Sequence, residues 1–228
     1  NAIGMMYNAL KANSPLVVTA GQQDNRMKLR EPLLSHDLVA MAAPVTKWSA
    51  EPATADEVGP MMRKAFKIAN ESPKGPVFVA LPINVMEQET SIAAETSGEI
   101  VISATPDAEA LSRISDMFIG ASNPAIIAGD EVPRTGALPL LIHFAEKTGS
   151  SVYHDGLRSQ VTFPSQHPAY CGRLPFEAGS IRKMLSKHDL LLVTDGATFD
   201  EVWFDEGGLV PETTKVVQIG DTMGRLAQ

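Results

Sequence analysis

The sequence predicts an α/β protein whose sheets are mainly parallel and covered by helices on both faces. Short apolar runs rich in β-branched residues recur along the chain without the polar alternation of a half-exposed strand. Segments with the apolar spacing of amphipathic helices lie between these runs, an alternation typical of α/β folds. The predicted strands cover residues 16–19, 45–48, 77–81, 125–128, 151–153, 190–193 and 216–219.

The helical pattern is already under way at the first residue. An apolar face begins with no capping residue before it, and it is formed by Ile3, Met6, Tyr7 and Leu10. This start predicts that the chain is part of a longer protein. The clearest helix covers residues 54–69, where Thr54 and Glu57 have the spacing of a capping box. Further helices are predicted over residues 107–119, 137–147 and 176–186.

Domain organisation follows from a change of composition after residue 83. Residues 84–103 are rich in Glu, Thr, Ser and Ala and carry few large apolar side chains, which predicts a solvated linker. The linker separates a first unit, residues 1–83, from a second unit, residues 104–228. Only the second unit has the length of an ordinary domain, and we expect it to be Rossmann-like.

Composition excludes several classes of protein. The chain has 228 residues and a formal net charge of −8, and its Lys and Arg residues are scattered, which argues against a nucleic-acid-binding surface. No apolar run approaches the roughly 20 residues that a membrane-spanning helix needs. The single cysteine, Cys171, excludes an internal disulfide and predicts a reducing compartment, the cytoplasm.

Three predicted strand ends are candidates for a ligand site. Gly21, Gln22 and Gln23 follow a strand directly, and ligands of open α/β sheets bind beyond the carboxyl ends of the strands. The competing interpretation is an ordinary exit loop with Gly21 at positive φ. The ends at 128–130 and 194–196 lack the glycine pattern of a dinucleotide site, so we expect an empty or vestigial crevice in the second unit.

The five histidines are dispersed and show no metal-binding spacing. His143 and His188 are predicted to be structural, and His167 is predicted to anchor a proline-bounded loop through hydrogen bonds. Cys171 has no activating partner near it in sequence, so a catalytic thiol is not expected. Local sequence therefore assigns no catalytic residue and no metal ligand.

Several motifs resemble, in order and spacing, those of enzymes that use thiamine diphosphate. They are N-A-I-G-M-M-Y-N-A from residue 1, S-P-L-V-V-T-A-G-Q-Q from residue 14, P-V-T-K-W-S from residue 44 and G-P-V-F-V-A-L-P from residue 75. A-S-N-P-A-I from residue 121 and F-P-S-Q-H-P from residue 163 continue the series into the second unit. Over essentially its whole length, the chain resembles the decarboxylase and acetolactate synthase superfamily, and most closely its benzoylformate decarboxylases.

The resemblance implies three α/β domains in the intact protein, two of which this chain holds in part. Residues 1–83 would be the C-terminal part of the pyrimidine-binding domain, and residues 104–228 most of the central domain. A diphosphate-binding domain that makes most contacts to thiamine diphosphate and Mg²⁺ would lie outside the chain. The resemblance also implies a small-molecule 2-oxo acid as substrate and a homodimer or homotetramer, with the fragment alone inactive.

Roles for individual residues follow from the same resemblance. The positions that match residues beside the cofactor are Asn1, Gly21, Gln22 and Gln23. Leu33 and Leu34 match a leucine pair that lines the substrate pocket of benzoylformate decarboxylases, where acetolactate synthases usually carry Phe-Gln. Such an apolar wall suits an aryl or alkyl substituent. From the residues alone, the two leucines could equally belong to a buried helix.

The reaction that we expect is non-oxidative decarboxylation of a 2-oxo acid to an aldehyde. One departure favours an alternative, because the catalytic histidine of benzoylformate decarboxylases aligns near Val202 and no histidine follows His188. The second hypothesis is therefore an acetolactate synthase-like carboligase. Such enzymes often hold FAD in the central domain, and no flavin-binding run stands out here. A third hypothesis, from another class, is a non-catalytic binding or structural module.

Overall fold

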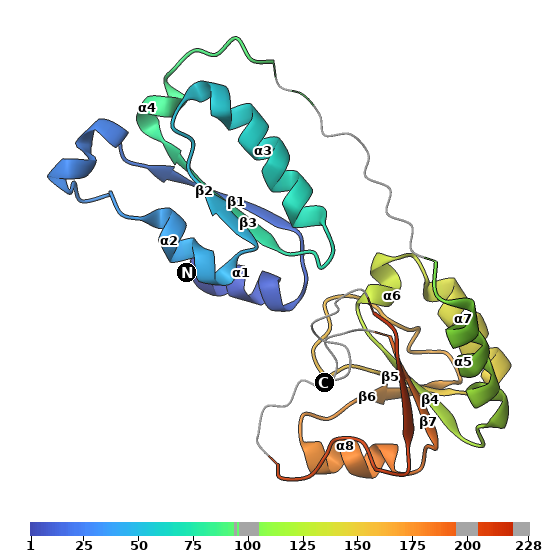
Figure 1. Ribbon diagram of the computed structural model, residues 1–228. Coiled ribbons are helices and arrows are strands. Elements are labelled where there is room, and N and C mark those ends of the chain that lie inside the picture. The colour runs from blue at the N-terminus through green and yellow to red at the C-terminus, as the bar shows by residue number, and fades with distance from the viewer. Residues whose placement is uncertain (94, 96–104, 195–204, 221–228) are drawn as a thin grey trace. The chain divides into compact units, whose positions relative to one another are not determined.

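The computed structural model describes residues 1–93, 95, 105–194 and 205–220, and the chain divides into two compact units, Asn1–Ile102 and Ser103–Gln228 (Figure 1). Each unit contains one parallel sheet with helices packed against it. The predicted α/β class is therefore confirmed. No helix in the described part of the chain combines the length and the apolar character needed to cross a bilayer.

The first unit is built on a three-stranded parallel sheet in the order β1–β3–β2. Its strands are β1 Leu16–Gln22, β2 Trp48–Ala50 and β3 Pro76–Pro82. Side chains of the central strand, β3, alternate between the two faces of the sheet. Phe78 and Ala80 pack in one apolar core, and Val77 and Val79 pack in the other. Because both faces are covered, β3 is a continuous apolar run in the sequence.

Helices cover both faces of this sheet (Figure 1). α1 Ala2–Lys11 and α2 Leu38–Ala42 supply Met6 and Ala42 to the core that contains Phe78. α3 Ala55–Asn70 supplies Ala65 and Ala69 to the core on the opposite face. The helix predicted to be under way at the first residue is confirmed as α1, and the helix predicted at 54–69 is confirmed to within one residue.

Two local predictions for the first unit are wrong in detail. Thr54 makes no side-chain capping hydrogen bond at the start of α3, and Glu57 Oε2 accepts instead from the Ala53 backbone N–H (2.7 Å). The strand predicted at 45–48 lies later in the chain, at β2 Trp48–Ala50, and a 3-10 turn, η2 Ala43–Val45, precedes it. The proline of η2 lies in its first turn, where no backbone donor is required.

The predicted linker begins too early at residue 84. Ile83–Met86 form a short helix, α4, and Val85 is buried, with 1% of its surface exposed. Farther along, Gln88 Oε1 accepts a hydrogen bond from the Ala55 N–H at the start of α3 (3.0 Å). The polar composition of the segment suggests a solvated linker, but its polar side chains form hydrogen bonds to the first unit. Most of the remaining predicted linker lies outside the described residues.

The second unit contains a five-stranded parallel sheet in the order β6–β5–β4–β7–β8. Its strands are β4 Pro124–Ala128, β5 Ser151–His154, β6 Tyr170–Arg173, β7 Leu190–Val193 and β8 Lys215–Gln218. α5 Ala108–Gly120 and α7 Leu138–Thr148 pack on one face, α8 Ala178–Leu185 packs on the other, and the short α6 Glu131–Arg134 follows β4. The strand order reverses between β4 and β7, where doubly wound sheets form their ligand crevice.

β6 was not predicted from the sequence. It lies at the edge of the sheet, its register shifts against β5, and it contains Gly172 at φ 105°. Cys171 and Arg173 are exposed on it. An edge strand of this kind has no apolar run to reveal it, because much of its surface faces water.

Candidate functional site

The end of β1 carries the residues predicted to face the cofactor. β1 pairs with β3 as far as Gln22, which lies opposite Pro82. Gly21 lies inside β1, is exposed, and does not have a positive φ, so the exit-loop interpretation that required a positive φ is wrong. A Cβ added at Gly21 would meet nothing within 4 Å. The strand end therefore presents an open stretch of extended backbone.

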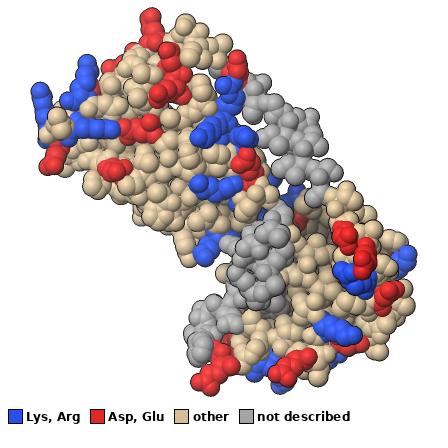
Figure 2. Space-filling view, in the orientation of Figure 1, with Lys and Arg blue, Asp and Glu red and all other residues tan. Residues whose placement is uncertain are grey.

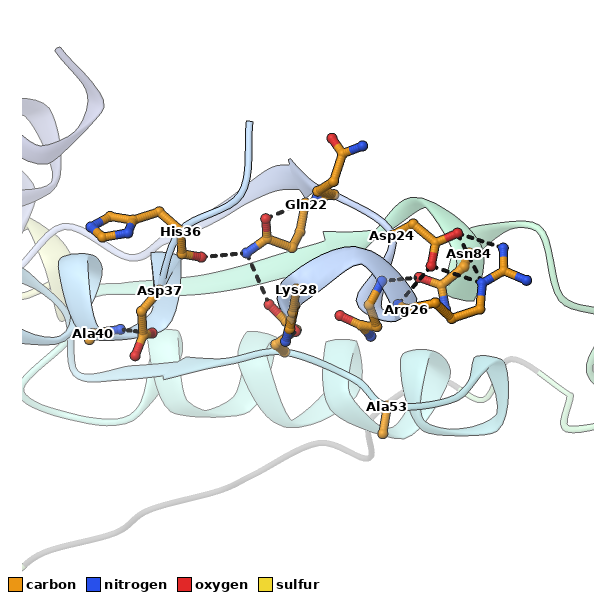
Figure 3. A network of polar contacts seen from close by, with 12 residues as sticks. Gln22, Asp24, Arg26, Lys28, His36, Asp37, Ala40, Ala53 and Asn84 are labelled. Atoms are coloured by element: carbon orange, nitrogen blue, oxygen red, sulfur yellow. Dashed lines mark hydrogen bonds and ion pairs between the residues drawn. The ribbon is translucent and has the colours of Figure 1, made fainter. Parts of the chain in front are cut away.

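The Gln22 side chain points into the first unit (Figure 3), and only 5% of the residue's surface is exposed. Its Nε2 donates to the His36 carbonyl (2.7 Å) and to Glu51 Oε2 (3.4 Å), and its Oε1 accepts from the Gln23 N–H (2.9 Å). These contacts satisfy a buried carboxamide that would otherwise be costly to desolvate. The more exposed positions at this strand end are Gly21 and Gln23.

Charged pairs fix the 3-10 helix that follows, η1 Asn25–Arg30. Asp24 caps η1 through a hydrogen bond from the Arg26 N–H to Oδ1 (2.8 Å), and the Arg26 side chain, which also bonds to Asp24, holds the pKa of this carboxyl below its ordinary value. Lys28 Nζ lies 2.5 Å from Glu51 Oε1, which joins η1 to the residue after β2. Lys and Arg side chains gather at the end of the first unit where η1 lies (Figure 2).

Leu33 and Leu34 lie in a turn between η1 and α2, and both are exposed, Leu33 to 98% and Leu34 to 75%. The turn is closed by a local hydrogen bond from the Ser35 N–H to the Pro32 carbonyl (2.9 Å). The alternative that the pair belongs to a buried helix is therefore wrong. Exposed leucines add little to the stability of the fold, and both side chains are available to a partner. Their assignment to a substrate pocket stays a prediction.

An open cavity of about 830 Å³ adjoins the turn. It is lined by Lys28, Glu31, Ser35, His36, Asp37, Val39 and Glu51. These residues come from η1, the turn, the start of α2 and the segment after β2, which are the segments joined by the Gln22 and Glu51 contacts. The mixture of carboxylates, an ammonium group and a hydroxyl suits the polar part of a ligand.

Asn1 is the N-cap residue of α1, is exposed, and makes no side-chain capping hydrogen bond. Its carbonyl accepts from the Met5 N–H (3.4 Å) within the same helix. Among the described residues, no hydrogen bond joins Asn1 to the group around Gln22. The structure thus brings the end of β1 together with the turn, and the predicted cofactor contact of Asn1 stays a prediction.

The carboxyl end of β4, in the second unit, is occupied by a carboxylate. Asp130 Oδ2 accepts from the Ser159 N–H (2.7 Å) and hydroxyl (2.5 Å), and Oδ1 accepts from the Gln160 N–H (3.1 Å). Arg134 Nη2 lies 3.4 Å from the same carboxylate. A diphosphate bound at this place would require free backbone donors, whereas these two are bound to Asp130. Residues 195 and 196, at the other predicted strand end, lie outside the described residues.

His188 is held inside the second unit and is 3% exposed. Nδ1 lies 3.0 Å from the backbone carbonyl of Asn123, which can only accept, so Nδ1 is the donor. The neutral Nε2 then accepts from the Tyr153 hydroxyl (3.1 Å). Burial lowers the pKa of His188. These contacts support the predicted structural role.

The remaining residues singled out in the sequence are His167, His143 and Cys171. His167 Nδ1 accepts from the Ala169 N–H (3.1 Å) and Nε2 lies 3.3 Å from Glu146 Oε1, which confirms the loop anchor. His143 is exposed on α7, and Cys171 is a free, exposed thiol. Within the described ranges, no three His, Cys, Asp or Glu side chains are grouped as a metal site would require.

The stability of the second unit is expected to fall as the pH is lowered below about 6.5. Burial lowers the pKa values of His154 and His188 from the ordinary 6.5, so the unfolded state binds protons at a pH where the folded state does not. The stabilisation from keeping both rings neutral is complete above the unfolded-state value and is lost as the pH falls toward the folded-state values. Urea denaturation from about pH 7.5 to about pH 5 measures this loss. His188→Gln should weaken the pH dependence, and an unchanged dependence would contradict a contribution from His188.

Known proteins are similar to the chain over most or all of its length. Benzoylformate decarboxylase from Pseudomonas aeruginosa is 29% identical over 231 residues, which cover 100% of this chain and 44% of that protein. The acetolactate synthase large subunit of Mycobacterium tuberculosis is 27% identical and is matched over 95% of this chain and 38% of that protein. The crystal structure of benzoylformate decarboxylase from Polynucleobacter necessarius has a TM-score of 0.88 and 29% identity, covering 100% of this chain and 43% of that chain.

The chain spans less than half the length of these relatives. A sequence model of one family, described as thiamine pyrophosphate enzyme, central domain, matches residues 111–226, more than half of the chain. The matched range includes every strand of the five-stranded sheet. This agrees with the family predicted from the sequence motifs. The chain therefore belongs to the thiamine pyrophosphate enzymes, and residues 111–226 match their central domain.

Proposed function

We propose that the chain forms two domains of a longer enzyme that uses thiamine diphosphate to decarboxylate a 2-oxo acid to an aldehyde. Residues 1–83, with the α4 segment packed on them, would form the C-terminal part of the pyrimidine-binding domain, and residues 104–228 most of the central domain. Similarity to benzoylformate decarboxylase over the full chain supports this assignment. The diphosphate and Mg²⁺ would be held mainly by a third domain, in the part of the relatives that this chain does not span.

The end of β1 fits the flat pyrimidine half of the cofactor. Gly21 has open space where a Cβ would lie, so an aromatic ring can approach the backbone there. Gln23 is only partly buried, and its carboxamide can donate to and accept from ring nitrogens and an amino group. When bound, the cofactor would supply the electron sink for decarboxylation, while this chain binds and orients it.

The exposure of Leu33 and Leu34 is the observation that carries the choice of substrate. Both side chains are largely exposed within the first unit, at 98% and 75%, and are therefore available to an apolar partner. Burying a leucine side chain fully is worth about 1.5–3 kcal/mol. An aryl or alkyl substituent of the 2-oxo acid would gain this energy, whereas a polar substituent would not.

A carboligase of the acetolactate synthase type is the second candidate. Similarity to an acetolactate synthase over 95% of the chain and the absence of a histidine after His188 in the sequence favour it. Position 202, where the histidine of benzoylformate decarboxylases aligns, lies outside the described residues. We further propose that the longer enzyme is a cytoplasmic homodimer or homotetramer.

The reaction product distinguishes the two candidates. Purified longer enzyme that contains this chain, supplied with thiamine diphosphate and Mg²⁺, should release benzaldehyde and carbon dioxide from benzoylformate. Formation of an acetohydroxy acid from pyruvate, without aldehyde from any aryl 2-oxo acid, would support the carboligase instead. No turnover of 2-oxo acids by cofactor-loaded enzyme would favour a non-catalytic module.

The 228-residue chain provides a second test. Calorimetric titration with thiamine diphosphate and Mg²⁺ should show no tight binding, because the proposed diphosphate-binding domain is not part of these residues. Tight binding with robust turnover by this chain alone would contradict the proposal that a third domain holds the diphosphate and Mg²⁺.

A further inference from the structure

We infer that Gln22 is a positioning residue that couples the cofactor-facing end of β1 to the turn that carries Leu33 and Leu34. The coupling itself is a property of the first unit and can be tested without any activity. Its consequence for substrate choice rests on the proposed function.

The carboxamide of Gln22 joins two segments that are distant in sequence. Its Nε2 donates to the His36 carbonyl at 2.7 Å, across 14 residues, while its Oε1 accepts from the N–H of the adjacent Gln23 at 2.9 Å (Figure 3). Gln22 is 5% exposed, so water does not readily replace either partner. A displacement of the strand end therefore displaces the turn as well.

Glu51 connects the same carboxamide to the other side of the turn. Its Oε2 lies 3.4 Å from Gln22 Nε2, and its Oε1 lies 2.5 Å from Lys28 Nζ in η1. The Glu51 side chain is 15% exposed, which strengthens both interactions relative to a surface pair. Lys28 precedes the turn and His36 follows it, so both ends of the turn are anchored at one polar centre.

The turn has little packing of its own to hold it. Leu33 and Leu34 project outward, and the Ser35–Pro32 hydrogen bond is internal to the turn. Beyond the turn, the Asp37 side chain accepts from the Ala40 N–H (2.8 Å) and caps α2. The position of the leucine pair relative to β1 therefore depends on the contacts of Gln22 and Glu51 together with the packing of α2 on the sheet.

Gln22→Glu in the 228-residue chain tests the coupling. The substitution keeps the shape, removes both donors and places a carboxylate beside Glu51. Amide hydrogen exchange at Ser35 and Leu38 should accelerate about tenfold, while the amides of β3 stay protected. Ser49→Ala is the matched control, because it removes another side-chain hydrogen bond to a backbone carbonyl, that of Val39 (3.1 Å), in the same unit.

Two further variants keep the test decisive. Adding Glu51→Gln to Gln22→Glu removes the repulsion between carboxylates but restores no donor to the His36 carbonyl, so exchange in the turn should stay raised. If Gln22→Glu also exposes β3, the uncharged Gln22→Met decides the question by the same measurement. Exchange in the turn that is unchanged, or equally raised by Ser49→Ala, would overturn the coupling.

The consequence for substrate choice is tested in the longer enzyme. Gln22→Met should lower the ratio of kcat/KM for benzoylformate to kcat/KM for pyruvate about tenfold, mainly through KM for benzoylformate, whereas Ser49→Ala should leave the ratio unchanged. An unchanged ratio in Gln22→Met would overturn the link to substrate choice. If the enzyme without substitutions turns over no 2-oxo acid, the proposed function is refuted. The hydrogen-exchange result for the 228-residue chain would still stand.

Discussion

Glutamine in place of both Leu33 and Leu34 is expected to lower kcat/KM of the longer enzyme for an aryl 2-oxo acid about a hundredfold. Each leucine packed against the aryl group would contribute about 1.4 kcal/mol, slightly less than a fully buried leucine side chain. Together these amount to about two factors of ten in rate. The free energy of unfolding of the 228-residue chain should change by less than about 0.5 kcal/mol, because both side chains are exposed.

Leu29→Gln is the matched control for this prediction. Leu29 is also a leucine of the same region, on η1, and it is 100% exposed. Leu29→Gln should leave both kcat/KM and the free energy of unfolding unchanged. An equal loss of activity in Leu29→Gln would indicate that any added polar side chain on this surface lowers activity, and an unchanged kcat/KM in the double variant would contradict the substrate wall.

Asp130→Ala is expected to lower the free energy of unfolding of the second unit by about 3 kcal/mol. Asp130 is 8% exposed, and its carboxylate accepts two backbone N–H groups and a hydroxyl, so the substitution removes three hydrogen bonds to a charged group. Hydrogen exchange of the β4 amides under native conditions reports this loss, since the central strand of the sheet opens only with the whole unit.

Glu109→Ala serves as the control for Asp130→Ala. Glu109 forms an exposed i,i+4 ion pair with Arg113 (2.9 Å) on α5. Pairs of this kind contribute about 0.5 kcal/mol or less. A comparable loss of stability in both variants would contradict a special role for the Asp130 network.

Elements that are stabilised by apolar burial were predicted from the sequence, and elements that lie at an edge or are bound by hydrogen bonds were not. β7 was predicted to the residue because Leu190–Val193 is a continuous apolar run covered on both faces. β6 was missed because it is a short edge strand around Gly172. α4 was missed because the segment after residue 83 is bound partly through hydrogen bonds to α3, which composition does not reveal.

The candidate site shows the same division. The stretch Gly21–Gln23 follows from a local pattern, but Gly21 and Gln22 belong to β1, which extends three residues beyond the predicted strand at 16–19. The partners of Gln22 were not predictable, because His36 contributes its backbone carbonyl and Glu51 lies 29 residues away. The exposure of Leu33 and Leu34 likewise depends on a turn that no apolar periodicity specifies.

Hydrogen exchange of the longer enzyme with and without its ligands tests the central claim most directly. Thiamine diphosphate with Mg²⁺ should slow exchange at residues 21–23, and a non-reactive aryl analogue of the substrate should then slow it at residues 33 and 34. Saturating cofactor and analogue that leave both segments unprotected, while protecting other parts of the chain, would contradict the account.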